Sequence, residues 1–183
     1  MPKKTISLII FILFIAVGVA QAQVSITYSS REKQYFSITI PDDWRVNVGS
    51  EADLSKLPED AKEPPRLVSA MPNGGVPLWF GMWVPEELEN IKDAQEYMRS
   101  LELDLLEDVV STERSFDSLN SMEIYYVSGT GKKEGEAMDF RAAFFQLSPE
   151  SVVIAIYIGP RDATSRHGKE LVRMIHSLQP VSR

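Results

Sequence analysis

The sequence predicts an α+β domain in which one antiparallel β-sheet is sandwiched between helices, an α/β/α sandwich. Short segments that alternate apolar and polar residues, separated by turn residues, dominate the chain and indicate strands. Three such segments, at residues 122–128, 137–147 and 152–158, follow one another closely and are apolar on both faces. A sheet of that kind must be covered on both sides, and two amphipathic helical segments are available to cover it.

Composition narrows the function classes before any motif is considered. The chain has 183 residues, the length of about one domain. Lys and Arg number 19 against 26 Asp and Glu, so the net charge is −7. This balance argues against nucleic-acid binding, which depends on a basic surface that contacts phosphates. The chain has no cysteine, which excludes disulfides, thiolate nucleophiles and cysteine zinc sites.

Residues 1–22 have the pattern of a secretory signal peptide. Lys3 and Lys4 precede an apolar run over residues 6–19, which ends at the small-residue pattern Ala20-Gln21-Ala22. The run is shorter than the roughly 20 apolar residues that span a bilayer, although an uncleaved anchor is the alternative. We therefore predict an exported protein, periplasmic or extracellular, with no membrane span after cleavage. The predicted divisions are the signal peptide at 1–22, an N-terminal extension at 23–34 and one domain at 35–183.

The first half of the domain is predicted to hold four strands and a helix. Residues 35–40 alternate and stop at Pro41, and a second strand follows over 44–48. Residues 49–65 are acidic and rich in proline, which indicates a long exposed loop. Strands over 66–71 and 78–84 are joined through an Asn-Gly turn. Apolar residues at three- and four-residue spacing then predict a helix over 91–107.

The second half is predicted to be an antiparallel meander followed by a helix. One face of the segment 137–147 carries Met138, Phe140, Ala142 and Phe144, and the other carries Ala143, Phe145 and Leu147. Residues 129–135 are predicted to be a glycine-rich hairpin loop, and 148–151 a tight turn. A final helix, capped by Asp162 or Thr164, carries Leu171, Val172, Ile175 and Leu178 and ends before Pro180.

This order of elements resembles the PsbP-like superfamily. The resemblance lies in the first strand with its proline and tryptophan and in the end of the last helix, at Phe36, Ile38, Ile40, Pro41, Trp44, Ile175, Ser177 and Leu178. It covers residues 35–180, nearly all of the predicted mature chain. The resemblance implies a PsbP-like fold and an adaptor or assembly role without catalysis. It implies no functional residue for this chain, because the binding segments of the photosystem members have no recognisable counterpart here.

The segment Trp79-Phe80-Gly81-Met82-Trp83 is the strongest candidate site. In a strand, Trp79, Gly81 and Trp83 share one face, so Gly81 leaves a shallow slot between two indoles. Such a slot suits a flat apolar ligand or a sugar ring. The alternatives are that a helix fills the slot and both indoles are core, or that the tryptophans contact a protein partner.

Other polar patterns are better explained structurally. His167 and His176 lie nine residues apart on one predicted helix, on opposite faces, and cannot share a metal ion. The acidic loop lacks the spacing of a calcium-binding loop, and Asp42-Asp43 reads as a turn. Residues 129–133 lack the strand-loop-helix context of a phosphate loop.

The sequence thus predicts an exported, non-catalytic binding or assembly module that contacts an envelope or secreted protein partner. The alternative is a carrier or receptor for a small apolar or sugar-like ligand, which binds at Trp79, Gly81 and Trp83. A hydrolase with a dispersed catalytic triad is the third reading. No metal, cofactor or nucleic acid is predicted to bind, and the pattern leaves the oligomeric state open.

Overall fold

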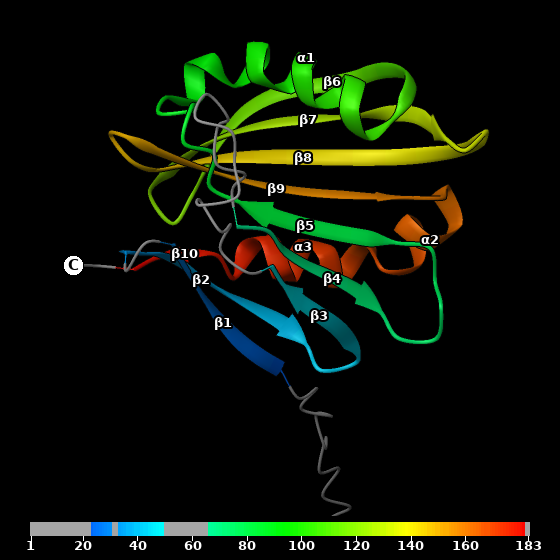
Figure 1. Ribbon diagram of the computed structural model, residues 1–183, viewed down its shortest axis with the longest axis horizontal. Helices are drawn as coiled ribbons and strands as arrows, with labels where there is room; N and C mark the ends of the chain where they lie inside the picture. The colour runs from blue at the N-terminus through cyan, green and yellow to red at the C-terminus, as the bar shows by residue number, and fades with distance from the viewer. Residues whose placement is uncertain (1–22, 31–32, 50–65, 182–183) are drawn as a thin grey trace, which may run out of the picture.

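The computed structural model describes residues 23–30, 33–49 and 66–181 (Figure 1). The predicted signal peptide and most of the acidic loop lie outside these residues. The strands of the described part are β1 (Gln23–Ser30), β2 (Lys33–Pro41), β3 (Trp44–Val48), β4 (Val68–Pro72), β5 (Trp79–Trp83), β6 (Glu107–Leu119), β7 (Met122–Lys133), β8 (Glu136–Ser148), β9 (Ser151–Gly159) and β10 (Gln179–Pro180). The helical elements are the short 3-10 turn η2 (Ile91–Asp93), α1 (Ala94–Leu105), α2 (Arg161–Arg166) and α3 (Gly168–His176).

The described strands form two antiparallel sheets. The larger has the order β3-β4-β5-β9-β8-β7-β6, and the smaller has the order β1-β2-β10. The predicted meander is confirmed: β7, β8 and β9 pair in sequence through short turns. The two predicted faces of β8 are also confirmed, because Phe140 and Phe144 belong to one buried cluster and Ala143 and Phe145 to the other.

The smaller sheet and α3 together cover one face of the large sheet. Their buried cluster includes Phe36 and Ile38 from β2, Leu171 and Ile175 from α3, and Phe145 from β8. The backbone N–H of Thr39 on β2 donates to Ser177 Oγ, just after α3, at 2.9 Å. Residues 23–30, predicted as an extension of the domain, form β1 and pair with β2 over their whole length.

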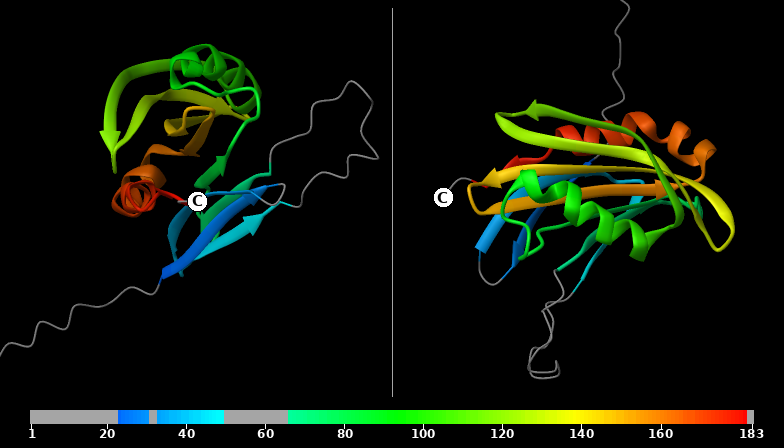
Figure 2. Two further views of the ribbon diagram at one scale, coloured as in Figure 1. Left: turned by 90° about the vertical axis from the view of Figure 1, so that its left-hand side faces the viewer. Right: turned by 90° about the horizontal axis from the view of Figure 1, so that it is seen from above.

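A single helix and the segment before it cover the opposite face. The second cluster joins Ile91, Ala94 and Met98 of η2 and α1 to Phe140 and Ile154 of the sheet. Figure 2 shows α1 and α3 on opposite sides of the large sheet. The side chain of Gln146 secures the segment before η2, accepting the Ile91 N–H at 2.8 Å and donating to the Glu89 carbonyl at 2.7 Å.

The predicted α/β/α sandwich is wrong. The described residues are mostly strand rather than helix. One long helix on each side of the large sheet does not make two helical layers, because a second sheet shares the cover on one face. Both faces of the large sheet are indeed buried, but much of the cover on one face is a second sheet. Val24, Ile26 and Tyr28 alternate with polar residues, which is the period of a strand, and the prediction of an N-terminal extension overlooked this pattern.

The predicted glycine-rich loop at 129–135 is also wrong, because β7 continues through it to Lys133. Only Glu134 and Gly135 form the turn to β8, with φ angles of +53° and +82°. Gly129 and Gly131 lie within the strand, where the neighbouring chain approaches closely: a Cβ at Gly129 would lie 2.3 Å from the Val110 carbonyl oxygen. The predicted final helix is divided at His167 into α2 and α3.

We expect Gly129→Ala to lower the free energy of unfolding by about 1–3 kcal/mol, because a backbone oxygen cannot move aside as a flexible side chain would. Gly168→Ala is the matched control. No atom lies within 4 Å of a Cβ at Gly168, which begins α3, so this change should be neutral or slightly stabilising. Urea denaturation of both variants measures the difference, and equal midpoints would contradict the packing argument.

Candidate functional site

The structure fills the slot that the sequence predicts between Trp79 and Trp83. Both side chains lie on one face of the sheet, as predicted, and this is the face that α1 covers. The six-membered ring of Trp79, however, lies directly over Gly81. A Cβ at Gly81 would lie 2.2 Å from Cη2 of that indole. The prediction of an open slot is therefore wrong, because the long side chain of Trp79 occupies the space that Gly81 leaves.

The two tryptophans have different environments. Trp83 is only 6% exposed and belongs to the core under α1, whereas Trp79 is half-buried and packs at the margin of that core. Tyr97 of α1 lies beside Trp83: burial raises the pKa of Tyr97, and a hydrogen bond with the Trp83 side chain partly opposes this shift. Trp83 is thus a core residue, and Trp79 is the indole that a ligand can reach.

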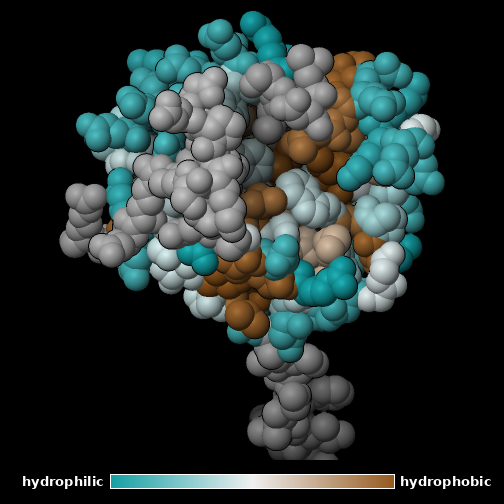
Figure 3. Space-filling model, in the orientation of Figure 1, coloured by the Kyte–Doolittle hydropathy of each residue, from teal (hydrophilic) through white to brown (hydrophobic). Residues whose placement is uncertain are grey.

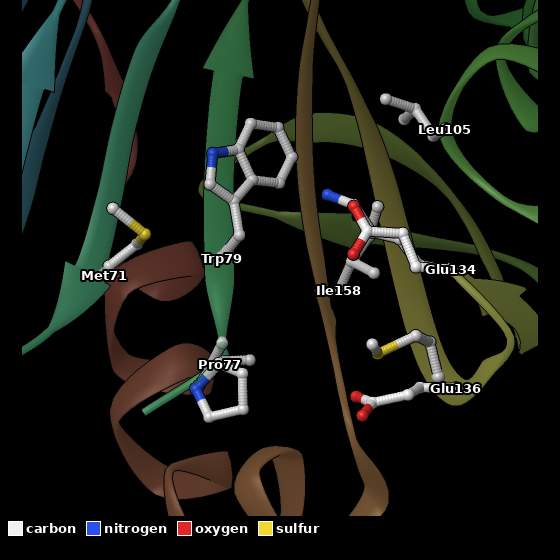
Figure 4. A pocket seen from close by; sticks show the side chains of 10 residues that line it. Met71, Pro77, Trp79, Leu105, Glu134, Glu136 and Ile158 are labelled. Carbon is white, nitrogen blue, oxygen red and sulfur yellow. The ribbon is translucent and has the colours of Figure 1, made fainter. Parts of the chain in front are cut away.

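Trp79 lines a pocket of about 540 Å³ at one end of the large sheet. Figure 4 shows Trp79 and Pro77 on one side of this space and the β7–β8 hairpin on the other. Figure 3, in the orientation of Figure 1, shows hydrophobic surface exposed to solvent on that face of the molecule. The pocket, hereafter the Trp79 pocket, is lined by Met71, Pro77, Leu78, Trp79, Leu105, Lys133, Glu134, Glu136, Met138 and Ile158.

The walls of the Trp79 pocket come from the margin of the large sheet, the segment before β5 and the end of α1. Leu105 is the last residue of α1, and the chain then turns back as β6. Met138 and Ile158 lie on β8 and β9, each 8% exposed. Leu78, which precedes β5, is 1% exposed and anchors the start of that strand. A preformed apolar cavity of this size is typical of small-molecule sites.

The charged residues of the Trp79 pocket all come from the β7–β8 hairpin. Lys133, Glu134 and Glu136 are exposed at its mouth. Glu134 and Gly135 both have positive φ, the geometry of a two-residue turn that matches the twist of paired strands. The turn therefore defines the backbone from which the two glutamate side chains extend beside the apolar lining.

His167 takes part in a structural cluster away from this pocket. Its Nδ1 lies 2.7 Å from Glu170 Oε2, and the same oxygen accepts the indole N–H of Trp44 at 3.2 Å. The rings of Trp44 and His167 meet edge to face at 5.7 Å between centroids. The cluster joins the start of α3 to β3, which agrees with the polar role that the sequence predicts for this histidine.

The remaining candidates from the sequence gain no support as sites. Asp42 and Asp43 are exposed in the turn between β2 and β3, where the Asp43 carbonyl accepts the Asn73 N–H at 2.9 Å. His176 ends α3 and is exposed. The acidic loop falls outside the described residues. Within the described ranges, no group of three His, Cys, Asp or Glu side chains could hold a metal ion.

The sequence reading missed most of the residues that line the Trp79 pocket. Its lining comes from the ends of β4, β5, α1, β7, β8 and β9, which are distant in sequence. Only Trp79 had a local pattern that pointed to binding. Lys133 and Glu134 were considered only as part of a loop, and Glu136 was not considered. The residues of a two-residue turn give no sign of the cavity beside it.

The fold is PsbP-like. The solution structure of cyanobacterial PsbP from Synechocystis aligns with a TM-score of 0.60 at 9% identity, over 91% of this chain and 96% of that chain. A crystal structure of a protein of unknown function from Pseudomonas aeruginosa aligns with a TM-score of 0.50 at 16% identity, over 87% of this chain and 99% of that one. A crystal structure from Bacteroides thetaiotaomicron aligns with a TM-score of 0.50 at 12% identity, over 81% of this chain and 46% of that one. These likenesses confirm the predicted fold resemblance and, at such identities, show the fold alone. The sequence matches no protein-family model and no curated protein.

We expect the two tryptophans to differ in their effect on stability. Trp83→Ala should lower the free energy of unfolding by about 3–5 kcal/mol, because it empties a core position. Trp79→Ala should cost about 1–2 kcal/mol, because part of that side chain already faces the pocket. Urea denaturation of the two variants tests this order. A loss for Trp79→Ala as large as for Trp83→Ala would place both indoles in the core.

Proposed function

We propose that the mature chain is an exported, non-catalytic binding module that holds a small apolar ligand in the Trp79 pocket. The observation that carries this proposal is the pocket itself: about 540 Å³ of preformed space lined mainly by apolar side chains, with an indole on one wall. Its volume lies within the usual range for small-molecule sites. The apolar side chains that make up most of the lining support a binding role.

Export is proposed from the sequence of residues 1–22. None of the helices in the described part of the chain has the length and apolar character that crossing a membrane requires. A sugar-like ligand fits less well than an apolar one, because hydroxyl groups need several polar partners and the polar residues stand only at the mouth. We therefore favour an apolar body within the pocket.

The neutral fluorescent probe N-phenyl-1-naphthylamine tests this function. We expect it to bind and to quench tryptophan emission, because the indole of Trp79 lines its site. Trp79→Ala should weaken binding by about 5-fold to 10-fold through lost aromatic contact. Trp44→Phe is the matched control, since Trp44 is buried in the opposite cluster. Absence of probe binding, or equal weakening by both variants, would contradict a ligand site at Trp79.

An assembly role through a protein partner remains the second candidate, and one observation favours it. Strand β6 is an edge of the large sheet, and its Phe116 is 61% exposed while its ring packs at a tilt against Tyr125, at 4.8 Å between centroids. An exposed edge strand can pair with a strand of another protein. The partner would be an envelope or secreted protein.

Affinity capture from cross-linked native cells tests the assembly role. If β6 is the contact, the tagged wild-type chain should capture one reproducible partner, and Phe116→Glu should lose it. Val172→Glu is the matched control, because Val172 is an exposed apolar residue on α3 rather than on β6. Capture that survives in the Phe116 variant would exclude the β6 edge as the contact.

A further inference from the structure

We infer that the Trp79 pocket selects ligands that join an apolar body to a cationic ammonium group. The inference rests on the proposed function, because it specifies the chemical class of ligand for the same pocket. The basis of the inference is that apolar and charged residues occupy different parts of the pocket. The walls are apolar, and every charged lining residue lies on one hairpin at the mouth.

The interior suits an alkyl or aromatic body. Trp79, Met138 and Ile158 present an indole, a thioether and an aliphatic side chain to the same space. The indole already rests on Gly81, so its outer surface can receive a ligand without a change of rotamer. Transfer of an apolar body from water to such walls is favourable in proportion to the area buried, whatever its head group.

The mouth suits a positive head group. Glu134 and Glu136 supply two carboxylates against the one ammonium of Lys133, so the hairpin carries an excess of one negative charge. Figure 4 shows both carboxylates reaching from the hairpin toward the side of the pocket that holds Trp79 and Pro77. An ammonium group placed there can donate hydrogen bonds to both carboxylates, whereas a carboxylate or sulfate head would be repelled by both.

The rigidity of the hairpin strengthens this selection. Lys133 and Glu136 pair directly across the two-residue turn, and Glu134 and Gly135 take the positive φ angles of that turn. The carboxylates therefore start from a fixed backbone, and little ordering of the chain is needed when a ligand arrives. Because all three charged side chains are exposed, their effect on affinity should be moderate and should decline as salt is added.

Competition among matched octyl compounds tests the inference. Octylammonium, octanol and octanoate carry the same body and differ only in charge, and each is used to displace N-phenyl-1-naphthylamine at low salt. We expect octylammonium to bind about 2-fold to 10-fold more tightly than octanol, and octanoate to bind more weakly than octanol. This range corresponds to modest exposed ion pairs with two carboxylates.

Variants that replace charged side chains with glutamine test which residues cause the preference for octylammonium over octanol. Glu134→Gln with Glu136→Gln should make octylammonium no better than octanol, while octanol binding stays unchanged. Lys133→Gln should increase the preference for octylammonium. The matched control is Glu123→Gln with Glu150→Gln, which changes the net charge equally at exposed positions. Glu123 lies roughly 30 Å from the hairpin along β7, and Glu150 lies in the turn at the opposite end of β8.

The outcomes separate this inference from the proposed function. If the probe and octanol bind but octylammonium binds no better, the apolar pocket stands and the cationic selectivity is refuted. A preference that survives in the Glu134/Glu136 variant, or disappears equally in the control, would attribute it to the overall charge of the chain and refute the role of the hairpin. If the probe does not bind at all, the proposed function fails and this inference fails with it.

Discussion

The structure depends on a strand, β9, whose side chains are buried on both sides of the sheet. Val153 and Ala155 belong to the cluster shared with α3 and the smaller sheet, while Ile154 and Ile156 belong to the cluster under α1. Neither set can face water without losing the main stabilising contribution of the fold. Each face of the large sheet therefore needs a cover, and the N-terminal strands, α1 and α3 are placed where they supply it.

The two covers are unequal, and the Trp79 pocket follows from that difference. A three-stranded sheet and a helix protect one face, whereas one helix and the segment before it protect the other. Helix α1 ends at Leu105, so the apolar face continues past it at Trp79, Met138 and Ile158. The cavity is thus a consequence of how far the cover reaches. Most of its apolar lining comes from the sheet, and its charged residues come from the hairpin that borders it.

The sequence correctly predicted those features of the fold that depend on the pattern of neighbouring residues along the chain. The alternation along β8 assigned Phe140, Phe144 and Phe145 to their correct faces, because side-chain direction in a strand has a period of two. What covers each face depends on contacts between distant segments, and there the predicted layer of helices was wrong. Gly129 was read as part of a loop because its composition suited one, whereas close approach of β6 is the reason for a glycine in that strand.

Trp79 illustrates how the packing of one side chain can differ from a geometry predicted from strand periodicity. Two tryptophans with a glycine between them on one face of a strand predicted a gap between the two indoles. A side chain as long as tryptophan, however, fills the space beside its own neighbour and buries apolar area by doing so, and Trp79 lies over Gly81 for this reason. One surface of the indole then contributes to folding, and the rest borders the pocket. Because folding has already fixed this rotamer, the ligand proposed for this pocket would meet an ordered wall, and its binding would incur less loss of side-chain entropy than at a mobile aromatic residue.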